Sequence, residues 1–173
     1  MRSRTAIWFE TKVKYEKMME DGQQKMVIEP YVVDALSFTE AESSILEEMS
    51  AYVSGAIAIT GISKVAYNEV FFSDADADDK FYKARLQFIT IDEKTEKEKR
   101  STVTYLVQAG SLMKAVKYID EIMGATMIDY VIISVAETKI MDVFEHNVSV
   151  KKAEPADVPE YEQSETGKAE EEA

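Results

Sequence analysis

Two stretches of the chain combine aromatic and basic side chains in a pattern that suits single-stranded nucleic acid. The first covers residues 8–15 and the second residues 81–88, and both alternate between two sets of side chains. Such alternation is typical of a half-buried β-strand, so one set faces the core and the other faces outwards. Outward aromatic rings stack on bases while cations contact phosphates. The candidate nucleic-acid-binding residues are Trp8, Lys12, Lys14, Phe81, Lys83 and Arg85.

Residues suited to catalysis are sparse. The chain has no cysteine, which excludes disulfides, thiolate zinc sites and cysteine nucleophiles. His146 is the only histidine, and because no recognisable nucleophile motif lies beside it, we interpret it as a surface residue. The six glycines form no phosphate-binding loop. The sequence therefore predicts a protein that is not an enzyme and that carries no cofactor.

An acidic segment, residues 74–79, resembles the start of a calcium-binding loop. A loop of the EF-hand type needs glycine at its sixth position and glutamate at its twelfth. Those positions hold Asp79 and Arg85 here. The segment also lies between two predicted strands rather than two helices. We interpret it as a solvated acidic linker without a metal ion, and weak calcium or magnesium binding is the open alternative.

The chain contains an internal repeat. Residues 8–15 and 81–88 share the same order of aromatic, charged, small, basic and aliphatic side chains. Further along, Tyr31-Val32-Val33 matches Tyr105-Leu106-Val107, and Glu69-Val70-Phe71 matches Asp142-Val143-Phe144. Order and spacing agree along both stretches, which favours a duplication over chance similarity. The two repeats cover about residues 6–73 and 81–146.

Each repeat reads as two strands, a helix and a strand. The first predicts strands over 6–18 and 25–33, a helix from the Ser37 capping box to Gly55, and a strand over 56–72 with a bulge at Gly61. The second predicts strands over 81–91 and 100–108, a helix over 111–123 and a strand over 129–144. The fold class is therefore α+β, with a duplicated β-β-α-β unit and two helices on one face of a mainly antiparallel six-stranded sheet. Two separate three-stranded sheets packed together are the open alternative.

The composition separates a domain from a tail. Residues 1–150 form a single domain, and residues 151–173 form an acidic tail with too few large apolar side chains to fold, which we expect to be disordered. The net charge is −13, but residues 153–173 alone contain eight acidic and one basic side chain, so a polyanionic ligand is not excluded. The tail also suits a protein partner. Apolar runs are too short to span a membrane, and early charges exclude a signal peptide, so we expect a cytoplasmic protein.

The opening segment carries a family resemblance. Arg4 to Val13, Asp34-Ala35 and the cap at residues 37–40 resemble a family of uncharacterised proteins from Bacteroidetes and their phages, including crAss-like phages. The similarity covers residues 4 to about 145. It implies no activity or functional residues, but it implies a phage or mobile-element context, often near DNA replication genes.

Two functions follow from these observations. The first is a non-enzymatic accessory protein that binds single-stranded DNA in phage or mobile-element replication. The alternative is a protein–protein interaction or structural module that forms a homo-oligomer and binds no nucleic acid. In the alternative, the two strands present an ordinary solvated face, and each aromatic side chain is covered by the tail, a loop or a second subunit.

Overall fold

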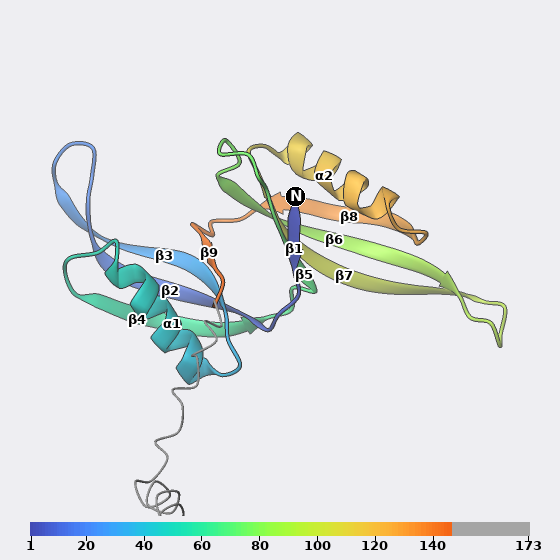
Figure 1. Cartoon of the computed structure of the whole chain (residues 1–173), viewed down its shortest axis with the longest axis horizontal. Helices are drawn as coiled ribbons and strands as arrows, with labels where there is room; N and C mark the ends of the chain where they lie inside the picture. The colour runs from blue at the N-terminus through green and yellow to red at the C-terminus, as the bar shows by residue number, and fades with distance from the viewer. Residues whose placement is uncertain (147–173) are drawn as a thin grey trace, which may run out of the picture.

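The computed structural model describes residues 1–146, which form two β-sheets, each with one helix on one face (Figure 1). The five-stranded sheet, here sheet A, has the order β1-β5-β7-β6-β8, and the four-stranded sheet B has the order β4-β2-β3-β9. In chain order the elements are β1 (Arg2–Arg4), β2 (Trp8–Met18), β3 (Gln24–Asp34), α1 (Phe38–Ser50), β4 (Ile57–Val65), β5 (Glu69–Phe72), β6 (Lys80–Ile91), β7 (Glu98–Ala109), α2 (Leu112–Gly124), β8 (Asp129–Glu137) and β9 (Val143–Phe144).

The α+β class is confirmed, but the single six-stranded sheet is wrong. Two sheets form because each of the two long strands predicted over residues 56–72 and 129–144 is interrupted, and its two parts join different sheets. Residues 56–72 divide into β4, which pairs with β2, and β5, which leaves for sheet A. Residues 129–144 divide in the same way into β8, which pairs with β6, and β9, which joins sheet B. The open alternative of two packed sheets therefore holds, with five and four strands in place of three each.

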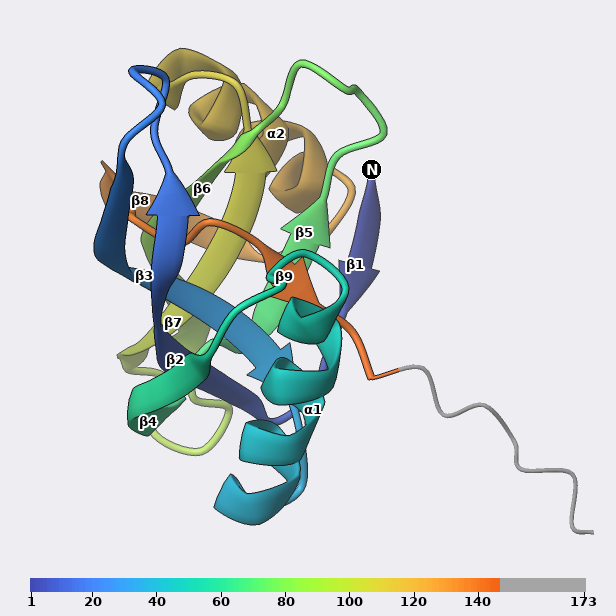
Figure 2. The ribbon, with the colours of Figure 1, turned by 90° about the vertical axis from the view of Figure 1, so that its left-hand side faces the viewer.

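The last strands of the two halves are exchanged. β5 runs parallel to β7, with Val70 opposite Leu106, and β9 runs parallel to β3, with Val143 opposite Val32. Figure 2 shows β9 beside β3 on the side of α1, while β5 and β1 belong to the other sheet. Each sheet is therefore completed by a strand from the other half of the chain.

The two halves of the chain share a bulge at the same place. The register between β2 and β4 shifts after Lys12, where Gly61 is the partner and Thr60 is skipped, in agreement with the predicted bulge near Gly61. The register between β6 and β8 shifts after Arg85, which is the equivalent position. A bulge increases the local twist of a strand pair, so we expect both pairs to bend alike.

Both helices begin where the sequence predicts. The Ser37 hydroxyl accepts a hydrogen bond from the Glu40 N–H, and the Ser111 hydroxyl accepts one from the Lys114 N–H. The first helix, however, ends at Ser50, several residues before Gly55, the predicted end. No helix in residues 1–146 is long and apolar enough to cross a membrane. The predicted tail lies outside the described residues.

Three regions of apolar packing stabilise the fold. One lies between α1 and sheet B and contains Val13, Tyr31 and Ile45, and another lies between α2 and sheet A. The third lies between the sheets themselves, on the faces that the helices leave free. This shared core consists of Trp8, Val32, Tyr67, Val70, Phe81, Leu106, Ile140 and Val143. Because burial of apolar area stabilises both sheets at once, neither sheet is independent of the other.

Candidate functional site

The two aromatic residues predicted to stack on bases are buried. Trp8 is 0% exposed and Phe81 is 2% exposed, and both lie in the core between the sheets. The expectation of an outward aromatic ring on each strand is therefore wrong. The alternation correctly places both side chains opposite the helices, but the facing sheet covers that end of each strand. Trp8 also leaves its buried indole N–H without a hydrogen-bond partner in the described part of the chain.

The four predicted basic residues are exposed. Lys12, Lys14, Lys83 and Arg85 reach solvent, and none is in an ion pair with another residue of the range 1–146. The structure does not bring all four together on one sheet. Lys12 and Lys14 lie on sheet B, and Lys83 and Arg85 lie on sheet A.

The two basic pairs differ in their surroundings. Lys83 lies between Leu106 and Ala136, and Arg85 lies between Thr104 and Ser134. Cross-strand neighbours project to the same side, so these residues share one surface. We call it the open face of sheet A, and it contains Lys83, Arg85, Gln87, Thr102, Thr104 and Ser134. Among the cross-strand neighbours on this face, carboxylates occur only at the far end of the hairpin, where Asp129 lies opposite Ile89 and Glu98 opposite Ile91. On β2, by contrast, Glu10 and Glu16 flank the two lysines on the same face of the strand.

The acidic linker is not fully solvated. Asp78 is 2% exposed, and its carboxylate accepts hydrogen bonds from Lys114 Nζ at 2.5 Å, Tyr118 OH at 2.7 Å, the Gly110 N–H at 2.7 Å and the Ser73 hydroxyl. Burial by itself would raise the pKa of Asp78, but these hydrogen bonds, that of Lys114 first, hold the pKa well below its usual range. The linker therefore anchors the start of α2.

The same segment offers no metal site. Asp74 pairs with the N-terminal amine at 2.6 Å, and Asp76 and Asp79 point into solvent. Within residues 1–146, no three histidine, cysteine, aspartate or glutamate side chains are grouped so that they hold a metal ion.

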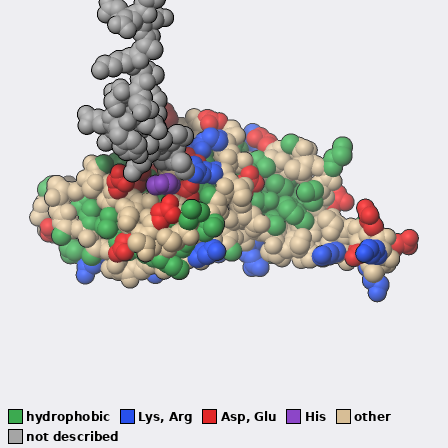
Figure 3. Space-filling model, turned by 60° about the horizontal axis from the view of Figure 1, so that its bottom comes forward, with side chains coloured by type: hydrophobic (Ala, Val, Ile, Leu, Met, Phe, Trp, Pro, Cys, Tyr) green, Lys and Arg blue, Asp and Glu red, His purple; other side chains and the backbone are tan. Residues whose placement is uncertain are grey.

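His146 is exposed, as predicted, and it joins the end of the domain to its beginning. Its backbone N–H donates to Asp34, which also pairs with Arg4, and its imidazole lies 3.9 Å from Glu40. The neighbouring Glu145 binds Arg2 at 2.6 Å. The histidine, purple in Figure 3, lies among acidic side chains on this face. These contacts fasten the chain after β9.

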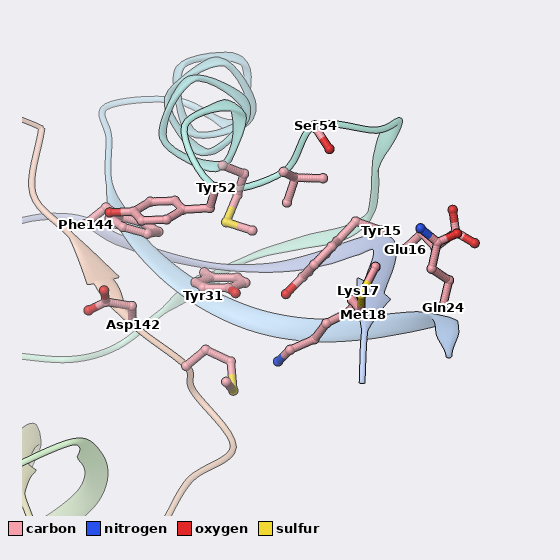
Figure 4. A pocket seen from close by; sticks show the side chains of 13 residues that line it. Tyr15, Glu16, Lys17, Met18, Gln24, Tyr31, Tyr52, Ser54, Asp142 and Phe144 are labelled. Carbon is pink, nitrogen blue, oxygen red and sulfur yellow. The ribbon is translucent and has the colours of Figure 1, made fainter. Parts of the chain in front are cut away.

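A pocket that sequence reasoning missed lies beside the C-terminal end of α1 (Figure 4). Its volume is about 520 Å³, and its walls come from β2, β3, the segment after α1 and the segment that leads into β9. Aromatic and methionine side chains form more than half of the lining, which also includes Glu16, Lys17, Gln24, Ser54 and Asp142. The main lining residues are Tyr15, Glu16, Lys17, Met18, Tyr31, Met49, Tyr52, Met141, Asp142 and Phe144.

Aromatic rings form one wall of the pocket. Phe144 lies between Tyr31 and Tyr52, with ring centroids 5.7 Å and 6.5 Å apart and interplanar angles of 19° and 27°. Tyr31 is 8% exposed, whereas Tyr52 is 73% exposed and presents its ring to solvent. Because Phe144 belongs to β9, this wall exists only when the exchanged strand is in place.

A hydrogen-bonded carboxylate lies under the pocket. Glu29 accepts from Tyr15 OH at 2.5 Å, Tyr31 OH at 3.0 Å and Lys17 Nζ at 2.8 Å. Burial by itself would raise the pKa of Glu29, but these three donors lower it. Burial, together with the Glu29 contact, raises the pKa of both tyrosines. Glu29 is therefore a charged carboxylate whose hydrogen bonds are made with donors of the protein itself.

One carboxylate at the rim of the pocket is not neutralised. Asp142 is in no ion pair with another residue of the described range, whereas Lys17 is neutralised by Glu29. The side chain of Glu16 projects to the other face of β2, with Lys12 and Lys14. Partial burial raises the pKa of Asp142, and a hydrogen bond from the Val143 N–H opposes that shift. The pocket thus combines aromatic walls with one carboxylate that has no ion-pair partner in residues 1–146.

A comparison with protein families finds one match. The model of a domain of unknown function, DUF4494, matches residues 7–146, which includes both sheets and the pocket. The search of curated proteins and the search of solved structures each found no match.

Proposed function

We propose that this protein, which belongs to the DUF4494 family of unknown function, is non-enzymatic and binds nucleic acid on the open face of sheet A. The observation that carries the proposal is the exposure of Lys83 and Arg85 without ion-pair partners among residues 1–146. Their cross-strand neighbours are hydroxyl or apolar side chains, which do not repel phosphate and, as Thr104 and Ser134, can donate to it.

The chemistry of this face restricts the mode of binding. Trp8 and Phe81 are buried and cannot stack on bases, so the preference for single strands loses its basis. Lys83 and Arg85 can still contact phosphates. The planar guanidinium of Arg85 can also stack on an exposed base. We therefore propose binding that depends strongly on salt and weakly on sequence. A role beside DNA replication in a phage or mobile element, which the family resemblance implies, belongs to the same proposal.

Fluorescence anisotropy with labelled DNA tests this proposal. The double variant Lys83→Glu/Arg85→Glu is compared with Lys94→Glu/Lys97→Glu, which makes the same charge change on exposed residues of the β6–β7 turn. We expect the first variant to lose binding and the second to retain it. For the wild type, the logarithm of affinity should fall linearly with the logarithm of salt, with a slope of about 0.7 per phosphate contacted in a single strand.

Two outcomes refute the proposal. One is an equal loss of affinity in both variants, since that would reflect net charge rather than this face. The other is the absence of salt-dependent binding in the full chain and in a chain that ends at Lys152, which lacks most of the acid-rich segment. An oligomer in light scattering, together with no DNA binding, would favour the alternative of a protein–protein interaction module.

A further inference from the structure

The pocket beside α1 differs from the equivalent place in the other half of the chain. Tyr15 and Phe88 occupy matching positions on β2 and β6, and Glu29 matches Val103, because Glu29 lies opposite Val13 and Val103 lies opposite Leu86. Phe144 and Phe71 match on the exchanged strands. The second half therefore packs phenylalanine and valine where the first half has a tyrosine hydroxyl and a carboxylate.

This difference argues for a function at the pocket. Phe88 and Val103 pack against the apolar core under α2, which shows that the fold accepts apolar side chains at these two positions. Replacement of a partly buried, hydrogen-bonded charged group by apolar side chains of similar volume is often neutral or stabilising for a fold. The first half nevertheless has Glu29, Tyr15 and Lys17 in a complete network. Polar groups that the fold does not require are expected where a ligand is bound.

The chemistry of the pocket selects the class of ligand. Tyr52 and Phe144 offer aromatic faces, which attract cations through the ring quadrupole. Asp142 adds negative charge at the rim without a neutralising partner in the described range. Three methionines, Met18, Met49 and Met141, give the lining a polarizable and adaptable surface. These groups favour an organic cation and disfavour a phosphate or carboxylate.

We propose that this pocket binds a basic side chain, arginine in the first place, of a partner protein. A guanidinium stacks on aromatic rings and pairs with carboxylates at the same time, because its plane and its N–H groups serve different contacts. The exposed ring of Tyr52 provides the stacking surface, and Asp142 provides the charged acceptor. The pocket is built on sheet B beside α1, whereas the open face belongs to sheet A. This proposal therefore does not depend on nucleic-acid binding.

Nuclear magnetic resonance titration of the full chain tests the proposal. The probes are four capped pentapeptides, acetyl-Gly-Ser-X-Ser-Gly-amide, in which X is arginine, lysine, norleucine or glutamate. We expect the arginine peptide to shift resonances of Tyr52 and Phe144, the lysine peptide to do so more weakly, and the norleucine and glutamate peptides to leave them unchanged. A mononucleotide serves as a fifth probe, since a base could stack in the same place, and we expect no shift with it.

Matched variants assign the binding to the pocket. Tyr52→Ala should weaken the arginine peptide about tenfold, whereas Tyr52→Phe, which keeps the ring, should bind it like the wild type. Asp142→Asn should weaken it as well, whereas Glu69→Gln, the same charge change at the equivalent position in the other half, the first residue of β5, should not. Tyr52 is exposed, so its replacement does not threaten the fold.

Several results would overturn the proposal. They are shifts of equal size with the norleucine or glutamate peptide, shifts at Tyr52 with the mononucleotide, unchanged arginine-peptide affinity in Tyr52→Ala, and no shift with any peptide. Equal effects of Asp142→Asn and Glu69→Gln would also refute it, because they would reduce the binding to net charge.

Discussion

Replacement of Asp78 by alanine should destabilise the protein by about 3 kcal/mol. The carboxylate accepts four hydrogen bonds, and its removal leaves the Gly110 N–H and two hydroxyl groups without their acceptor. Loss of one partner from a buried charged network costs about 3–5 kcal/mol. We take the lower end because the Lys114 side chain is 37% exposed and returns its ammonium group to water.

Urea unfolding at neutral pH measures this loss, with Asp76→Ala as the control. Asp76 lies two residues away in the same linker but is exposed, so its removal should change stability by less than about 0.5 kcal/mol. In a thermal melt, 3 kcal/mol corresponds to about 6–12 °C for a domain of this size. Surface substitutions change stability by up to about 0.5 kcal/mol. If the free energies of unfolding of Asp78→Ala and Asp76→Ala differ by less than about 0.5 kcal/mol, the linker does not anchor α2.

The pH dependence gives a second check on the same carboxylate. The folded-state pKa of Asp78 lies below its unfolded value of 3.8, so its ionised form stabilises the fold above that value. The contribution is lost as the pH falls below the unfolded pKa towards the folded one. The stability difference between the wild type and Asp78→Asn should therefore narrow in acid, and a difference that widened would contradict the reasoning.

Three further sets of substitutions test the packing. Trp8→Phe should cost less than about 2 kcal/mol, because it removes an indole N–H that has no hydrogen-bond partner among residues 1–146, whereas Trp8→Ala should cost about 3–5 kcal/mol in urea unfolding. Gly110→Ala should destabilise by about 1–3 kcal/mol, since its Cβ would lie 2.7 Å from the Ala77 carbonyl oxygen, and Gly55→Ala, with open space around it, should be neutral in the same melt. Tyr15→Phe/Glu29→Val, which copies the second half, should unfold within about 1 kcal/mol of the wild type; a larger loss would mean that the network is structural.

Local sequence patterns predicted the elements well. Alternation in residues 6–18 and 81–91 located both long hairpins, and the serine caps located the starts of both helices. The turn after β2 follows the prediction, since Gly22 has a φ of 78°. Strands, helix caps and turns depend on residues that are close together in the chain, so they can be predicted from short stretches of sequence.

The pairing of distant strands was not predicted, because periodicity states which side chains share a face but not what covers it. The sequence nevertheless contains a signal for the burial of Trp8 and Phe81. Tyr31-Val32-Val33 and Tyr105-Leu106-Val107 are apolar without alternation, which is typical of a strand covered on both faces. Their central residues, Val32 and Leu106, lie in the core between the sheets.

The pocket could not be located from the sequence, because its walls come from segments that are far apart in the chain. Its signal is a difference between the repeats, a tyrosine and a glutamate in one where the other has Phe88 and Val103. That difference becomes meaningful only when the register shows that the positions are equivalent.

The exchanged strands determine when the fold can form during synthesis. Val32 and Val33 are made early, but their partners on the parallel side are Val143 and Phe144. A ribosome adds about 5–20 residues per second, so the first sheet waits several seconds for its last strand. Until then the apolar edge of β3 and the ring of Tyr31 remain uncovered, and contacts this distant in sequence form slowly. We therefore expect this protein to be most exposed to aggregation, or to binding by a chaperone, during synthesis, after its first half is made and before β9 is added.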